Sequence, residues 1–150
     1  MIDYKELTKI EILASMPPED LILIAEISTE ENFKSDDIVF AEDASANKLY
    51  LLKEGRIGIF MEIPANRKML IEKVESGGVF GWSSIIPPYK YSSTAQCIED
   101  SKVVSVDGKR LKGLFLKNCR FGYIFMEHIA DIMSLKLKLT RLQFMHLMKW

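Results

Sequence analysis

The hydrophobic pattern opens with helical spacing that a proline pair interrupts. Apolar residues three or four positions apart predict helices, and Pro17-Pro18 ends the first one because proline disrupts a helix interior. Glu19 and Asp20 suit the first turn of a second helix, where the helix dipole favours acidic side chains. The apolar positions are Leu7, Ile10, Leu13 and Ala14, followed by Leu21, Ile24 and Ala25. We therefore expect a helical N-terminus over residues 1–29.

Between residues 30 and 107 the pattern changes to a period of two. Short runs rich in β-branched and aromatic residues alternate with turn signals, as is typical of antiparallel sandwiches and barrels. The predicted strands are Asp37–Ala41, Lys48–Lys53, Arg56–Glu62, Lys68–Val74, Val79–Gly81, Tyr91–Ile98 and Lys102–Val106. This segment is predicted to form a β-barrel.

Helical spacing returns over residues 108–150. A short helix around Leu111–Leu116 precedes a long helix from about Arg120 to Met148, with Asn118 as its predicted N-cap. The long helix has one seam at heptad spacing, Ile132, Leu135, Leu139 and Leu142, and a second apolar stripe, Ile129, Met133, Leu137, Phe144 and Met148. One side can cover the barrel, and the other then needs a partner, most simply a second copy across a twofold axis. We expect the heptad seam to form a homodimer interface; the alternative is a helix folded wholly onto its own barrel.

Length and composition favour one domain over residues 1–150. The chain has 48% apolar residues, enough for a hydrophobic core. Its apolar runs are shorter than the roughly 18 residues of a membrane span, and its start lacks the features of a signal peptide. Cys97 and Cys119 form no CxxC motif and are interpreted as reduced core thiols. These features predict a cytoplasmic domain that does not interact with membranes.

Charge is unevenly distributed along the chain, although the net charge is only −1. Residues 1–100 carry 10 basic and 18 acidic side chains, whereas residues 101–150 carry 10 and 3. A basic segment can indicate an acidic partner. Lys136, Lys138, Arg141 and Lys149 are interleaved with Leu and Thr, however, so a solvated face of an amphipathic helix is the simpler interpretation.

The order of helices, strands, short helix and long helix resembles the cyclic nucleotide-binding domain family. This family includes the sensor domains of catabolite activator protein-like (Crp/Fnr) regulators. Its barrel signature is matched by Asp36–Asp43 (DDIVFAED), Leu49–Leu52 (LYLL) and Gly55–Ile57 (GRI). Asp36 and Asp43 replace two turn glycines, and aspartate adopts positive φ more readily than most residues. The resemblance implies a mostly β (α+β) fold: a double-stranded β-helix, or jelly-roll barrel, with N-terminal helices and a long C-terminal dimerisation helix.

The resemblance also implies a ligand site, which departs from the family pattern. The phosphate-binding cassette of the family aligns with Phe80–Ile85 and Tyr91–Ala95. Trp82 and Tyr91 stand where the family has a glutamate for the ribose 2′-hydroxyl and an arginine for the cyclic phosphate. Each such contact contributes about 1.5–3 kcal/mol, so we expect cAMP binding to be weaker by roughly 100- to 10,000-fold. The predicted ligand-binding residues are Gly81, Trp82, Ser83, Ser84, Ile85, Tyr91, Ser92 and Ser93.

Three interpretations of this cassette stay open. In the first, Trp82 and Tyr91 are flat walls of a pocket that binds a different, unidentified small molecule, aided by the N–H groups of Ser83 and Ser84 and the hydroxyls of Ser92 and Ser93. In the second, the two rings fill the pocket and the domain is a ligand-free protein-interaction module. In the third, a cyclic nucleotide binds through non-standard contacts. In the ligand-responsive interpretations, the long helix relays the signal to an unknown downstream protein, as the resemblance implies.

The sequence predicts neither catalysis nor direct DNA binding. A metal-dependent barrel enzyme needs several histidine and carboxylate ligands, but His128 and His146 both lie on the long helix. The chain contains no Gly-x-x-x-x-Gly-Lys-Ser/Thr loop and no strand-borne histidine to activate a serine. We therefore expect no enzyme, no metal and no cofactor. Because the chain ends directly after the long helix, we expect no recognition helix and no DNA contact.

Overall fold

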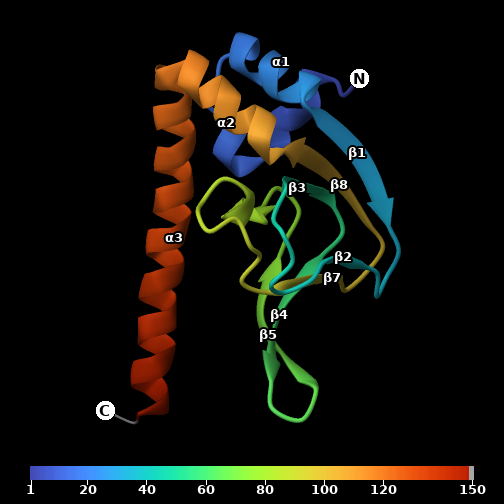
Figure 1. Ribbon diagram of the computed structural model, residues 1–150, viewed down its shortest axis with the longest axis vertical. Helices are drawn as coiled ribbons and strands as arrows, with labels where there is room; N and C mark the ends of the chain where they lie inside the picture. Colours follow the sequence, from blue (N-terminus) through green and yellow to red (C-terminus); the bar gives the residue numbers. More distant parts are fainter. Residues whose placement is uncertain (149–150) are drawn as a thin grey trace.

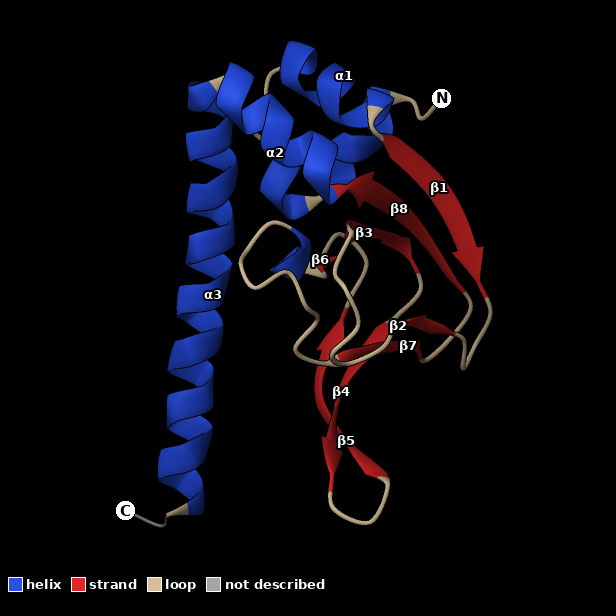
Figure 2. Ribbon diagram, in the orientation of Figure 1, coloured by secondary structure: helices blue, strands red, loops and turns tan. Residues whose placement is uncertain are grey.

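The computed structural model describes residues 1–148 and consists of two antiparallel sheets flanked by helices (Figure 1, Figure 2). The strands are Ser28–Phe33 (β1), Ile38–Phe40 (β2), Lys48–Glu54 (β3), Ile57–Ile63 (β4), Arg67–Val74 (β5), Val79–Phe80 (β6), Thr94–Cys97 (β7) and Ser101–Asp107 (β8). The 3-10 helices are Tyr4–Lys9 (η1), Glu11–Leu13 (η2) and Trp82–Ser84 (η3). The α-helices are Pro18–Glu26 (α1), Gly108–Lys117 (α2) and Cys119–Leu147 (α3).

The strand order is that of a jelly roll. One sheet runs β1-β8-β3-β6 and the other β2-β7-β4-β5. Strands distant in sequence are therefore neighbours: Ser28 of β1 lies opposite Val106 of β8, and Ile57 of β4 lies opposite Cys97 of β7. This arrangement confirms the predicted fold class, with helices before the strands and a long helix after them.

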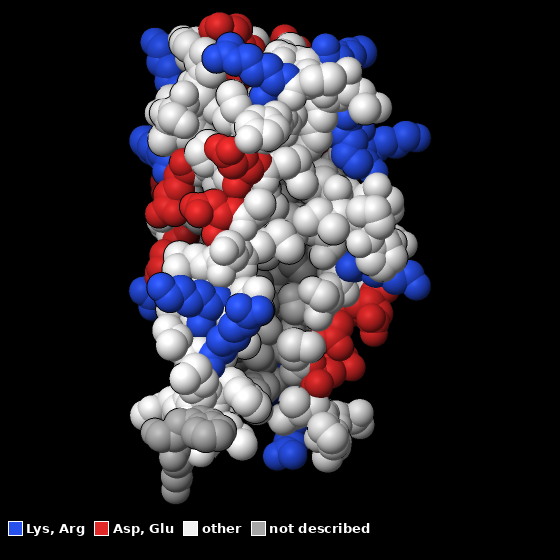
Figure 3. Space-filling model, turned by 90° about the vertical axis from the view of Figure 1, so that its left-hand side faces the viewer, with Lys and Arg blue, Asp and Glu red and all other residues white. Residues whose placement is uncertain are grey.

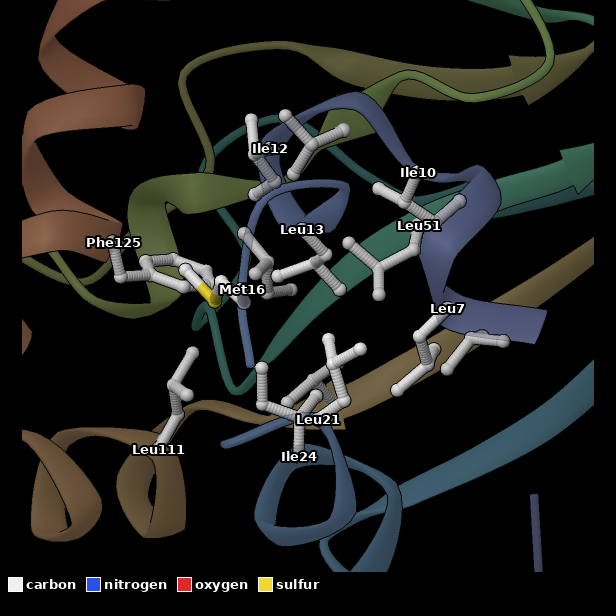
Figure 4. Close-up of a cluster of buried hydrophobic side chains, with 14 of the residues drawn as sticks. Leu7, Ile10, Ile12, Leu13, Met16, Leu21, Ile24, Leu51, Leu111 and Phe125 are labelled. Carbon is white, nitrogen blue, oxygen red and sulfur yellow. The ribbon is translucent and has the colours of Figure 1, made fainter. Parts of the chain in front are cut away.

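Strand β3 is buried on both faces, which explains its unbroken apolar run. Leu49 and Leu51 join a core between the first sheet and the helices, while Tyr50 and Leu52 join a second core between the two sheets. The first core draws on η1, η2, α1, α2 and α3 (Figure 4). The helices are thus fixed on the outer face of one sheet, and the inter-sheet core remains available to shape a cavity.

Two parts of the sequence-based prediction need correction. The first predicted helix is a pair of 3-10 helices separated at Ile10, which has an extended backbone, and the N–H of Glu11 donates to the carbonyl of Gly77 at 3.0 Å. Strand β1 was not among the predicted strands, because its sequence STEENF has little apolar alternation. It forms nevertheless as an edge strand paired along its whole length with β8.

The prediction for the two aspartate turns is confirmed. Asp36 and Asp43 have φ angles of 73° and 68°, in the left-handed region. The Asp43 N–H donates to the carbonyl of Tyr91 at 2.8 Å. This bond joins the loop after β2 to the segment that leads into β7.

Helix α3 is anchored at its start and exposed at its end. The side chain of Asn118 accepts a hydrogen bond from the N–H of Phe121 at 3.0 Å, which confirms the predicted N-cap. Phe121, Phe125 and Ile129 are buried against the rest of the chain, whereas the apolar residues after Ile132 are largely exposed. Within residues 1–148, no helix is long and apolar enough to cross a membrane.

Candidate ligand-binding site

A cavity of about 210 Å³ lies at the predicted cassette, bounded by the sheet of β4 and β5, the η3 turn and α3. Its wall is mostly apolar, with hydroxyl groups and one charged side chain of each sign. The lining residues are Phe40, Ile59, Met61, Ile71, Glu72, Val74, Phe80, Gly81, Trp82, Ser83, Tyr91, Ser92, Ser93 and Lys136. The cavity thus joins residues from both sides of the inter-sheet core with one residue of the long helix.

Gly81 shapes the cavity because it allows the chain to turn where a side chain has no room. Its φ of 77° lies in the left-handed region. A Cβ there would come within 3.1 Å of the Tyr50 ring and 3.3 Å of the Lys48 carbonyl. Both the N–H and the hydroxyl of Ser84 donate back to the Gly81 carbonyl, at 3.3 and 3.1 Å. The turn therefore places Trp82 and Ser83 at the cavity wall and directs Ser84 inward.

Tyr91 forms the floor of the cavity rather than a mobile wall. Its ring stacks on Phe40, with centroids 3.7 Å apart and an interplanar angle of 12°. Its hydroxyl donates to the Lys48 carbonyl at 2.7 Å and accepts from the Lys48 N–H at 3.3 Å. Burial raises the pKa of Tyr91 despite its hydrogen bonds to the backbone, so the phenol stays neutral. Tyr91, which we expect at the position of the family arginine, supplies no charge.

Trp82 forms one side of the cavity together with Lys136 of α3. Trp82 is half-buried, and the ammonium nitrogen of Lys136 lies 4.9 Å from the centroid of its ring. At this distance the cation is attracted by the ring face. Lys136 also forms an ion pair with Glu72 of β5. Burial lowers the pKa of Lys136 to about 8, because desolvation disfavours the charged amine, whereas the adjacent Glu72 carboxylate acts in the opposite direction.

Lys136 is a candidate site residue that the sequence-based prediction did not include. It was assigned to a solvated basic surface, but it is half-buried in the cavity wall. A signal was present: Lys136 follows Ile129 and Ile132 by seven and four positions, which places it on the face of the helix that those residues bury. Lys138 and Arg141 are exposed, and Lys149 lies outside the described residues.

The structure brings six of the eight predicted ligand-binding residues together at the cavity. Gly81, Trp82, Ser83, Tyr91, Ser92 and Ser93 line it. Ser84 and Ile85 do not, because Ser84 is turned into the η3 hydrogen bonds and Ile85 packs in the core beneath the helices. The N–H of Ser84 is therefore already paired, which removes one of the predicted anion donors.

The predicted dimer residues separate into one inward and three outward positions. Ile132 is half-buried and packs against the core beneath the helices, and its assignment to a dimer interface stays a prediction. Leu135, Leu139 and Leu142 are exposed on the surface of the chain, and Leu135 and Leu139 flank a groove between α3 and the β5–β6 turn. Figure 3 shows this face of the molecule, with charges of both signs in separate small groups along it.

The site can hold a small molecule through apolar contact, hydroxyl hydrogen bonds and one cation. Among residues 1–148, no group of three or more histidine, cysteine, aspartate or glutamate side chains is placed to hold a metal ion. The cavity combines a flat tryptophan, the hydroxyls of Ser83, Ser92 and Ser93, and the Lys136–Glu72 pair. Such a set suits recognition of a ligand and offers no evident nucleophile with an activating base.

Comparison with known proteins shows similarity to cyclic nucleotide-binding domains. The profile of the cyclic nucleotide-binding domain matches residues 30–118. Over 106 residues the chain is 26% identical to a CRP-like cAMP-activated global transcriptional regulator of Mycobacterium tuberculosis. The matched region covers 71% of this chain and 47% of the regulator. The chain thus spans about half the length of that relative.

Two solved structures show the same architecture. A candidate cyclic nucleotide-binding protein from Geobacter metallireducens has a TM-score of 0.82 and 32% identity, over 91% of this chain and 99% of that one. The catabolite activator protein of Thermus thermophilus has a TM-score of 0.74 at 16% identity, over 89% of this chain and 61% of that one, a likeness of fold alone. These relatives are described as binding proteins and regulators, not as enzymes.

Proposed function

Because this chain belongs to the cyclic nucleotide-binding domain family, we propose that it is a sensor whose cassette cavity binds a small molecule and whose helix α3 transmits the binding event. At the level of the family it is a cyclic nucleotide-binding-like regulatory domain and not an enzyme. The observation that carries the proposal is the composition of the cavity wall. Trp82 and Ser83 of the cassette and Lys136 of α3 line the same space, so a bound molecule would touch both the cassette and the long helix.

The proposed ligand is not cAMP bound in the usual way. Tyr91 is neutral, buried and hydrogen-bonded to the Lys48 backbone at the position of the family arginine. Trp82 has no carboxylate to accept the ribose hydroxyl. Losing two charge-assisted contacts weakens binding by roughly 100- to 10,000-fold, which moves a micromolar ligand out of the physiological range.

Calorimetry and thermal unfolding test this function. We expect cAMP and cGMP to show no binding at micromolar concentration, and at least one molecule from a panel of small organic acids to raise the Tm. At 100 times the dissociation constant, a ligand adds about 2.7 kcal/mol to stability. Ser92→Phe should abolish the shift by filling the cavity mouth, whereas Ser134→Phe, an exposed position on α3 outside the cavity, should not. Micromolar cAMP affinity would overturn the exclusion of the standard ligand.

A ligand-free interaction module is the alternative, and the burial of Tyr91 in the inter-sheet core favours it. In that case the cavity is a remnant and the downstream protein docks irrespective of small molecules. This alternative would be supported over the sensor if no compound of the panel raised the Tm of the unmodified chain or of Ser92→Phe.

We also propose that α3 pairs with a second copy of the chain. The support is the exposed apolar surface on its second half, where Leu139, Leu142 and Phe144 are 49%, 50% and 62% exposed. Apolar side chains clustered in this way on a helix face mark interaction surfaces.

The two cysteines are both free thiols, which suits a reducing cytoplasm. The basic and acidic groups visible beside α3 in Figure 3 form no continuous positive stripe, which favours a protein partner over DNA.

A further inference from the structure

We propose that Lys136 supplies the cationic contact for an acidic group of the ligand, and that Glu72 is the partner which this group displaces. The inference rests on the proposed sensor function and assigns a chemical class to its ligand. That class is a small, flat, largely apolar molecule with one carboxylate or one phosphate monoanion. The helix that transmits the signal would then hold the charge that recognises the signal molecule.

The first support is the uniqueness of the charged pair. Among the residues that line the cavity, Lys136 is the one cation and Glu72 the one carboxylate. The two side chains form an ion pair and are 33% and 32% exposed. A partly buried pair leaves an unpaired charge when one member is removed, which is unfavourable unless a replacement arrives. An acidic ligand offers that replacement for Lys136.

The second support is the difference in how the two side chains are held. Lys136 lies against the Trp82 ring and projects from α3, which is packed on the body by Ile129 and Ile132. Glu72 projects from β5, the edge strand of its sheet, and is 32% exposed. Glu72 can therefore turn toward water when an anion takes its place, whereas Lys136 has the aromatic ring as its neighbour. Displacement of Glu72 by an anion is favoured over displacement of Lys136 by a cation.

The third support is the size and lining of the cavity. About 210 Å³ lies below the roughly 300–1,000 Å³ of pockets that hold drug-sized ligands. Trp82 presents a flat face, and Ile59, Met61 and Ile71 complete an apolar wall. One ring or two fused rings with a single acidic group match this combination. A carboxylate and a phosphate share the needed charge, so the proposed class includes both.

The proposal gives a route from the ligand to α3. Lys136 stands one turn beyond Ile132, where the packed part of the helix gives way to its exposed second half. When a ligand displaces Glu72, Lys136 loses its contact with β5 and contacts a molecule that lies against Trp82. The position of the free half of α3 is thereby coupled to occupancy of the cavity.

The test uses naphthalene-2-carboxylate, its neutral amide, naphthalen-2-ylmethylamine and inorganic phosphate as probes, with calorimetry for affinity and the Trp82 indole NMR signal for location. In the unmodified chain, we expect the carboxylate to bind about tenfold more tightly than the amide, and the amine to bind no better than the amide. Phosphate alone should bind weakly if the apolar wall contributes. Cyclic AMP in the same assay reports whether a bulkier phosphate can use Lys136.

Matched variants assign the effect to the pair. Lys136→Met should remove the preference for carboxylate over amide, and Lys136→Arg should retain most of it. Glu72→Gln should raise carboxylate affinity several-fold because the competing carboxylate is gone. Lys138→Met, an exposed lysine on the same helix, should change nothing. Circular dichroism before each titration verifies that the variants are folded.

Two kinds of contrary result are distinguishable. If the probes shift the Trp82 signal but carboxylate and amide bind alike, or if Lys136→Met keeps the preference, the assignment of Lys136 is wrong and the sensor function stands. Tighter binding of the amine would reverse the roles of Lys136 and Glu72 and also overturn the assignment. If no probe and no member of the acid panel shifts the Trp82 signal, the sensor function itself fails, and this inference fails with it.

Discussion

At the scale of single residues, Tyr91 shows how a side chain can close one part of a site and leave the rest open. Its ring continues the stack that includes Phe40, Tyr50 and Phe80, and its hydroxyl both donates to and accepts from the backbone of Lys48. A group so satisfied has little left to offer a ligand. The chemistry of the cavity therefore depends on the residues around Tyr91, above all on Lys136.

The contribution of the Tyr91 hydroxyl to stability can be measured directly. We expect Tyr91→Phe to lower the free energy of unfolding by about 1–2 kcal/mol, because the Lys48 backbone loses a buried partner. Urea denaturation gives the value. Tyr123→Phe is the matched control: its hydroxyl bonds Glu127 on the exposed surface, and the change should stay within about 0.5 kcal/mol. Equal effects for the two variants would contradict the role assigned to Tyr91.

The Lys136 amine predicts a pH dependence for any acidic ligand. Because burial lowers the pKa of Lys136 to about 8, the amine is charged below that pH and loses its proton above it. Affinity for an acid should be constant below about pH 7 and fall by up to about tenfold per pH unit above 8. Glu72 from β5 is paired directly with the amine, and the groove on its other side also carries Glu11, Lys73, Glu75 and Asp131. Variants of Lys136 therefore decide whether the loss belongs to its amine.

Calorimetry of naphthalene-2-carboxylate between pH 6 and 9.5 provides the measurement. Lys136→Met should give a flat profile, and Lys136→Arg should shift the fall beyond the measured range because arginine stays charged. An unchanged fall in Lys136→Met would assign the titration to another group.

At the scale of elements, helices α2 and α3 pack closely because of one glycine. A Cβ on Gly122 would meet the Cβ of Phe115 at 2.8 Å and its Cα at 3.1 Å. Phe115 in turn contacts the rings of Phe121 and Phe125 at centroid distances of 5.5 and 5.2 Å. This aromatic contact fixes the angle at which α3 leaves α2, and thus the position of Lys136.

Two glycine substitutions separate packing from helix propensity. Both glycines lie inside helices, where alanine is favoured by about 1 kcal/mol. At Gly113 nothing lies within 4 Å of an added Cβ, so Gly113→Ala should raise the free energy of unfolding by up to about 1 kcal/mol. At Gly122 the clash with the Phe115 backbone should outweigh propensity, giving a destabilisation of about 1–3 kcal/mol. Thermal unfolding of the pair is decisive, and stabilisation by Gly122→Ala would show that α2 and α3 can separate freely.

At the scale of the whole molecule, α3 divides into an anchored half and a free half. Its first half completes the core beneath the helices (Figure 4), while its second half runs alongside the β4–β5 hairpin with apolar residues exposed (Figure 1). The hairpin adds exposed Met61, Met69 and Leu70. An isolated chain with this much exposed apolar surface is expected to associate.

Removal of the apolar seam tests the association. Leu139→Glu combined with Leu142→Glu places two charges on the exposed side of α3, where they destabilise a helix pair without disturbing the core. Sedimentation should change from the mass of a dimer to that of a monomer. Leu116→Glu, on α2 and 83% exposed, should leave the dimer intact. A dimer that persists in the double variant would place the interface elsewhere.

Local pattern was sufficient for most of the elements, whereas the location of the cassette followed from the family resemblance. The period of two, the turn signals and the polar caps act between neighbours in sequence, so β3, β4, β5, β8 and the Asn118 cap were predictable from the pattern. The left-handed turns at Asp36 and Asp43 were predictable from the family resemblance, because these residues replace two turn glycines. Six of the cassette residues line one cavity because they lie in two short segments that the fold brings together.

The tertiary structure decided what depends on contacts between distant segments. Strand β1 exists because β8 provides its hydrogen bonds, and Ile132 turns inward because a core lies beneath it. Ser84 and Ile85 do not line the cavity. The Ser84 hydroxyl donates to the Gly81 carbonyl within the η3 turn, and Ile85 packs in the core. Lys136 lies 54 positions from Trp82 and 64 from Glu72, and only the packing of α3 brings the three together. The sequence by itself determined most strands, the helix cap and, through the family resemblance, the place of the cassette. The charge in the cavity wall was decided by the tertiary structure, because spacing along α3 shows which face Lys136 shares but not which strand and turn that face meets.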